Sequence, residues 1–248
     1  MSRFNFGGAG NTPPVVKNLI IINVAMFIAF YLFDSLFRIN LNRVLGLYYI
    51  QSDTFQPWQI VTHMFMHGGF IHILFNMWAL WIFGKTLESV WGSKRFLTYY
   101  LVTGLGAAAM LTLVNFIQVY SLATKISPAD FDMITSQGND LILQGQNYVN
   151  PVLGKLNLLL HTPTVGASGA VFGLLLAFGM LFPNTPLMII PIPVPIKAKW
   201  LVIGYGVLEL YLGLTQANSN IAHFAHLGGM IFGFILIKYW NKRSRNFY

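Results

Sequence analysis

Six stretches of this sequence are predominantly apolar and close to the length of a bilayer-crossing helix, and this feature limits the fold most strongly. A transmembrane helix needs about 20 mostly apolar residues, within a range of about 17–25. Charged residues make up only 9% of the chain, against roughly 25% in a typical soluble domain, so polar side chains are too few to cover a water-soluble globule. The sequence therefore predicts an all-α, polytopic membrane protein with a bundle of six transmembrane helices. The expected spans are 19–37, 60–83, 96–119, 166–182, 200–214 and 224–240.

These spans and their connections are expected to form a single membrane domain, residues 1–248. No small-residue cleavage site follows the first apolar stretch, so we expect it to be retained and not removed as a signal peptide. Ser127 and Pro128 are typical of a helix start, whereas five prolines in 183–199 exclude a helix and predict an extended cytoplasmic connection. The other connections are a short N-terminal tail 1–18, an outer loop 38–59, a long outer loop 120–165 and a cytoplasmic tail 241–248.

The distribution of basic residues indicates how the chain crosses the membrane. Six spans place both termini on one side, with eleven basic residues on that side and four on the other. The positive-inside rule therefore favours cytoplasmic N- and C-termini. This topology also accounts for the formal net charge of +8, so the basic excess does not indicate a nucleic-acid partner.

Polar side chains inside apolar spans are costly in lipid, and so they face the bundle interior or a water-filled cavity. Ser168 begins the fourth span within the sequence Gly-Ala-Ser-Gly-Ala, which starts at Gly166. The small neighbours allow another helix or a substrate backbone to approach closely. The motif alone also fits simple packing of small residues between helices.

The second and sixth spans carry the other informative polar residues. In the second span, His63 and His67 lie four residues apart, as do His72 and Asn76, so each pair shares a helix face. The sixth span begins near His226.

Two glycines in the sixth span, Gly229 and Gly233, form a GxxxG face for close helix approach. They lie three and seven residues after His226, which favours His226 over His223 as the functional histidine.

The predicted topology places these polar residues at one depth. The second, fourth and sixth spans all run inward from the outer side, so Ser168, His226, His72 and Asn76 enter at a similar level. A serine hydroxyl becomes a nucleophile when a base takes its proton, and neutral His226 can serve as that base. His72, Asn76 and the backbone N–H of Ser168 are candidate oxyanion donors. No acidic partner for His226 is evident, so we expect a Ser–His dyad in a hydrated pocket open to the outside.

Taken together, these motifs resemble those of the rhomboid intramembrane serine proteases, and the resemblance covers nearly the whole chain. It implies a six-helix rhomboid-like bundle, with Ser168 as nucleophile and His226 as general base. It also implies an oxyanion hole formed by the three donors named above. The matching segments are HMFMH at 63–67, HILFN at 72–76, GASG at 166–169 and AHLGG at 225–229, followed by Gly233.

The resemblance further implies roles for neighbouring residues. His67 would be structural, and His63 would join the hydrogen-bond network of the cavity. Phe172, where the family often has Tyr, would pack under the His226 ring. The large outer loop would lie half-submerged in lipid, and the fifth span with the outer cap 215–223 would gate substrate entry.

Further positions either bear on the resemblance or have no role in it. Glu88 and the turn 92–94 match the family's inner loop, whereas Gln59 stands where the family often has Arg. Glu209 in the fifth span has no assigned role, and we expect it to meet the outer aqueous cavity.

The resemblance implies a serine endopeptidase that cleaves single-pass membrane proteins in or near the outer part of their transmembrane segment. Small residues at the scissile position beside helix-breaking sequence are expected, because a helical substrate hides its carbonyls in hydrogen bonds. The expected partners are these substrates and the lipid bilayer, with no cofactor and no metal. Chain size, the bare six-span form and the lack of a transit peptide favour a bacterial plasma (inner) membrane.

Three alternatives remain open at this point. A non-catalytic rhomboid-like protein would bind transmembrane helices without cleaving them. A metal-dependent protease is disfavoured because HMFMH lacks the Glu of H-E-x-x-H. A transporter would show inverted repeats and broken helices, which the sequence does not suggest.

Overall fold

The computed structural model describes residues 12–189, 192–215 and 220–243. Within these ranges the chain forms helices and one short pair of strands. Three expected segments fall partly outside the described residues, namely the N-terminal tail 1–18, the outer cap 215–223 and the tail 241–248.

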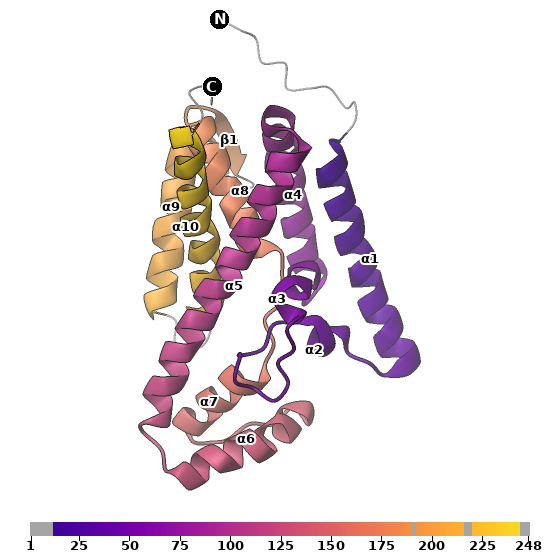
Figure 1. The fold of residues 1–248 in the computed structure, drawn as a ribbon, viewed down its shortest axis with the longest axis vertical. Helices are drawn as coiled ribbons and strands as arrows, with labels where there is room; N and C mark the ends of the chain where they lie inside the picture. The colour runs from indigo at the N-terminus through magenta and orange to yellow at the C-terminus, as the bar shows by residue number, and fades with distance from the viewer. Residues whose placement is uncertain (1–11, 190–191, 216–219, 244–248) are drawn as a thin grey trace, which may run out of the picture.

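The long helices of the chain lie side by side as a bundle (Figure 1). The start of the first and the end of the last lie at the same end of the bundle, as expected for an even number of crossings. α10 packs against α5, α8 and α9, and so it lies at the centre of the half of the bundle that carries Ser168. The six helices are α1 (Pro14–Phe37), α4 (Phe70–Trp91), α5 (Ser93–Ala123), α8 (Ser168–Leu181), α9 (Ala198–Thr215) and α10 (Asn220–Arg243).

Among the described residues, four helices are long and apolar enough to cross a membrane: α1, α4, α5 and the part of α10 from Ala222 to Lys242. α8 is apolar but has 14 residues, about 21 Å of helix against a hydrocarbon core of about 30 Å. The chain before α8 runs into the bundle from the end at which α6 and α7 lie (Figure 1). The all-α membrane bundle is confirmed, whereas the count of six spans stays a prediction.

The second expected span, 60–83, is wrong at both ends. α4 begins at Phe70 and continues to Trp91. Before it, the chain forms the short helix α3 (Gln59–Thr62) and the 3₁₀ turn η1 (His63–Phe65). Gly68 and Gly69 then interrupt the helix, because glycine has a low helix propensity. His63 and His67 therefore do not share a face of the spanning helix.

The two outer loops contain helices of their own. The first holds α2 (Leu41–Leu45), and the second holds α6 (Pro128–Leu143) and α7 (Pro151–His161). The predicted helix start at Ser127 is confirmed, because its Oγ accepts the backbone N–H of Asp130 at 3.1 Å. Leu47 and Thr164 pair in a β-bridge that ties the first loop to the segment before α8.

The proline-rich connection is extended, as predicted. β1 (Pro186–Ile189) and β2 (Ile192–Lys197) pair antiparallel, with Pro186 opposite Lys197. Residues 190–191 between them lie outside the described part. The pair joins α8 to α9 at the end of the bundle where α1 begins and α10 ends (Figure 1).

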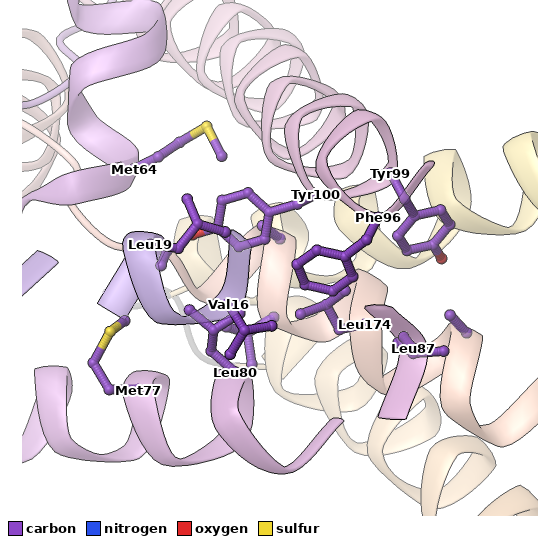
Figure 2. Packing of buried hydrophobic residues seen from close by; sticks show 14 of the residues in the cluster. Val16, Leu19, Met64, Met77, Leu80, Leu87, Phe96, Tyr99, Tyr100 and Leu174 are labelled. Atoms are coloured by element: carbon purple, nitrogen blue, oxygen red, sulfur yellow. The ribbon is translucent and has the colours of Figure 1, made fainter. Parts of the chain in front are cut away.

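Buried side chains fill the space between α1, α4, α5 and α8, and Figure 2 shows them at close range. This packing joins the first span to the helix that carries Ser168. Most of the central side chains are almost fully enclosed. They include Val16, Leu80, Phe96, Tyr100 and Leu174.

The start of α1 is held by Glu88 of α4. The carboxylate of Glu88 accepts the backbone N–H groups of Val15 at 3.0 Å and Val16 at 2.8 Å, and it also accepts the Ser93 hydroxyl at 2.7 Å. These backbone groups have no partner within their own helix. Gly92, with φ +76°, makes the turn between α4 and α5 that brings Ser93 to the carboxylate.

Candidate active site

The Ser168 hydroxyl and the His226 imidazole meet between α8 and α10. Ser168 is the first residue of α8, and His226 lies in the second turn of α10. Nε2 of His226 is 2.9 Å from Oγ of Ser168, within hydrogen-bond distance. The rival histidine, His223, makes its hydrogen bond to Glu209 instead.

Glycines set the close approach of α10 to its neighbours. A Cβ on Gly229 would overlap the carbonyl oxygen of Gly169 in α8. A Cβ on Gly233 would overlap the hydroxyl of Tyr99, which donates a 2.9 Å hydrogen bond to the carbonyl of Gly173. The predicted GxxxG face is therefore used against two helices, α8 and α5, and this packing brings His226 to Ser168.

Phe172 supports the imidazole ring from below. It lies one helical turn after Ser168, and its ring stacks on the ring of His226 with centroids 4.1 Å apart and planes 7° from parallel. The structure thus places Phe172 where the sequence predicts it. The stacking restricts the rotation of the His226 ring, so its Nε2 stays directed at the hydroxyl.

The surroundings of Glu209 differ from those expected from the sequence. It does not face an open aqueous cavity, since only 7% of its surface is exposed. Its Oε2 accepts a hydrogen bond from Nδ1 of His223 at 2.6 Å and lies 3.1 Å from Nδ1 of His226. The expectation of no acidic partner for His226 is therefore wrong. The one sequence feature that points to this contact is the lone carboxylate in the span 200–214. Which residue pairs with it depends on the packing of α9 against α10.

The segment before Ser168 brings its backbone under His72. Gly166 has φ +136°, a conformation that favours glycine. A Cβ at this position would lie 2.9 Å from both Cε1 and Nε2 of His72. His72, Gly166, Ser168 and His226 line one cavity of about 170 Å³. The backbone N–H of Ser168 lies at the N-terminus of α8, where N–H groups lack helical partners.

Asn76 is placed differently from the other candidates. Its amide donates a 2.8 Å hydrogen bond to the carbonyl of His72, one turn before it in α4. It is not among the residues that line the cavity. The structure thus brings His72, but not Asn76, into the cavity that Ser168 and His226 line.

The two histidines of the segment 63–67, His63 and His67, lie close to the same cavity. His63 lines the cavity, its Nδ1 bonds to the carbonyl of Gln59 at 2.9 Å, and its own carbonyl accepts the N–H of Gly166 at 2.9 Å. His67 is 1% exposed, and its ring meets the edge of His72 at 5.0 Å between centroids. His63 therefore lies in the cavity wall and His67 packs against His72, which also lines the cavity.

Gln59, the departure from the family pattern, ties the first outer loop together. Its Oε1 accepts the N–H of Gln56, and its Nε2 donates to the carbonyls of Val44 and Thr54. It is only 1% exposed. An amide supplies both donors and acceptors, which an arginine at this position would not.

Glu209, His223 and His226 each offer a donor atom within 4.8 Å of the others, so these three residues could hold a metal ion. In the structure the same atoms are engaged with one another, and Nε2 of His226 is directed at Ser168. The arrangement fits a hydroxyl activated by a base, with the cluster supporting that base.

Comparison with known proteins shows similarity to rhomboid proteins over most of this chain. The rhomboid domain model matches residues 54–243. RHOMBOID-like protein 12, mitochondrial, of Arabidopsis thaliana is 30% identical over 218 residues, which are 87% of this chain and 55% of that protein. Rhomboid protease GluP of Bacillus subtilis is 28% identical over 71% of this chain and 25% of its own length. Rhomboid protease AarA of Providencia stuartii is 25% identical over 95% and 74%.

The matched part of the chain is long enough to assign its family. The chain spans about half the length of the Arabidopsis and yeast relatives it matches. The domain match nevertheless covers well over half of the chain and includes Ser168, His226 and every motif named above. This chain belongs to the rhomboid family and is an integral, multi-pass membrane protein.

Proposed function

We propose that this chain is an intramembrane serine endopeptidase. The observation that carries the proposal is the 2.9 Å contact between Ser168 Oγ and His226 Nε2 in a cavity between helices. Two relatives are named rhomboid proteases, GluP and AarA. The family-level activity and the geometry of the site therefore point to the same chemistry.

In the proposed reaction Ser168 attacks the scissile carbonyl while His226 takes its proton at Nε2. A bond forms between Oγ and the carbonyl carbon, and the electron pair of the C=O bond moves to the oxygen. His72 and the backbone N–H of Ser168 are the donors placed to stabilise this oxyanion. The C=O bond then re-forms as the C–N bond breaks, and His226 gives its proton to the leaving amine. In the second half His226 takes a proton from water, the hydroxide attacks the ester carbon, and the Oγ–C bond breaks as His226 returns the proton to Ser168.

The proposed substrates are single-pass membrane proteins, cleaved in or near the outer part of their transmembrane segment. Thr164, Val165 and Gly166, which precede α8, line the cavity, and on the proposed topology this segment enters from the outer side of the membrane. We also propose that both termini are cytoplasmic and that the chain crosses the membrane six times. The names of the matched relatives indicate mitochondria, a chloroplast and bacteria, so they do not favour the expected bacterial plasma membrane.

The test uses purified protein in liposomes with a model single-pass substrate. Ser168→Ala and His226→Ala are each expected to abolish cleavage, and a chelator is expected to have no effect. Ser89→Ala is the matched control, because Ser89 is exposed on α4 and donates to the carbonyl of Lys85; full activity is expected. Cleavage that survives Ser168→Ala would overturn the assignment, and binding of transmembrane helices without cleavage would favour the non-catalytic alternative.

A further inference from the structure

We propose that Glu209 is a positioning residue for His226, so that the site works as a Ser–His–Glu triad and not as a dyad. The inference rests on the proposed protease function and adds a third residue to it. It comes from the contacts on the two nitrogens of one imidazole ring. Nε2 of His226 faces Ser168 Oγ at 2.9 Å, and Nδ1 faces Glu209 Oε2 at 3.1 Å.

The two contacts require different protonation of the two ring nitrogens of His226. A neutral imidazole carries one proton, so Nε2 can accept the Ser168 proton only when Nδ1 carries the hydrogen. Nδ1 of His226 is buried and has no aligned hydrogen bond among the described residues. Glu209 is the acceptor beside it. Its carboxylate selects the required tautomer and then stabilises the imidazolium formed when Ser168 attacks, while remaining ionised itself.

The surroundings of Glu209 favour this role over incidental burial. A carboxylate inside an apolar helix is costly unless it is paired. His223 bonds the same oxygen at 2.6 Å, which fixes the carboxylate where it meets His226. Packing of α9 against α10 does not depend on this group alone, because Val202 of α9 and Met230 of α10 also belong to one buried apolar cluster.

The experiment measures kcat and KM for cleavage of the model substrate in liposomes, together with thermal unfolding. Glu209→Gln preserves the size of the side chain but removes its charge. We expect kcat to fall by on the order of 100-fold with KM within about twofold, since loss of the orienting carboxylate in a serine triad costs at least this much. Glu209→Asp should recover part of the loss in kcat.

Glu88→Gln is the matched control, because Glu88 is also a buried glutamate but holds the start of α1. It should lower the unfolding temperature and leave kcat within about twofold. A Glu209→Gln variant with unchanged kcat, or one whose loss matches that of Glu88→Gln, would overturn the triad. If Ser168→Ala stays active, the protease proposal itself fails; if Ser168→Ala is inactive and Glu209→Gln is fully active, only the triad fails.

Discussion

Replacing Gly229 by alanine tests how the packing of α10 on α8 builds the site. The added Cβ would overlap the carbonyl oxygen of Gly169, which is a backbone atom and cannot rotate away. Because a carbon–oxygen contact needs about 3.3 Å, the helices must separate by on the order of 1 Å. Overpacking costs about 1–3 kcal/mol, and alanine recovers up to about 1 kcal/mol of helix propensity. We expect the unfolding free energy to fall by about 1–2 kcal/mol.

The same displacement should affect catalysis more than stability. It moves His226 away from Ser168, so the 2.9 Å contact opens to about 4 Å, beyond hydrogen-bond range. General-base catalysis contributes about 10²–10⁴-fold, so kcat should fall at least about 100-fold. Cleavage in liposomes and thermal unfolding measure the two effects. The control is Gly204→Ala in α9, where nothing lies within 4 Å of an added Cβ. If Gly229→Ala matched this control in both assays, the packing argument would be refuted.

Three further predictions concern residues around the site and in the outer loop. Phe172→Ala removes the ring that stacks on the His226 imidazole and should lower kcat, whereas Phe172→Tyr keeps the ring and should stay within about threefold, as cleavage rates would show. Gly166→Ala forces a side chain into φ +136° against His72 and should cost about 1–3 kcal/mol by thermal unfolding; an unchanged unfolding temperature would contradict it. Burial and the nearby Arg43 lower the pKa of His161 in the outer loop, so the folded state binds its proton less readily and stability should fall as pH drops below about 6.5; His161→Gln should reduce this acid sensitivity in unfolding measured against pH.

Local sequence features predict that Ser168 and His226 lie at a similar depth in the bundle, and the structure brings their side chains together. Ser168 and His226 were recognisable because polar side chains are costly within apolar spans. Phe172 follows Ser168 by one helical turn, so its place on the same face could be read from spacing alone. In the structure His226 contacts both Ser168 and Phe172.

Features that depend on how helices meet were not predictable in the same way. Hydropathy alone does not reveal that Gly68 and Gly69 interrupt the second apolar stretch, so it predicts His63 and His67 within the spanning helix, whereas both precede α4. Asn76 shares a helix with His72, but its amide bonds to the backbone and not into the cavity. The partner of Glu209 is set by packing between α9 and α10, which no local pattern encodes.

The most direct test of the central claim is covalent labelling of Ser168 by a serine-reactive fluorophosphonate, read by mass spectrometry of the intact protein and its peptides. An activated hydroxyl reacts, whereas an ordinary buried serine does not. We predict one adduct per chain, located on Ser168, formed in parallel with loss of cleavage and absent in His226→Ala. Continued cleavage by fully labelled protein, or an adduct at another residue that accounts for the inhibition, would contradict the account.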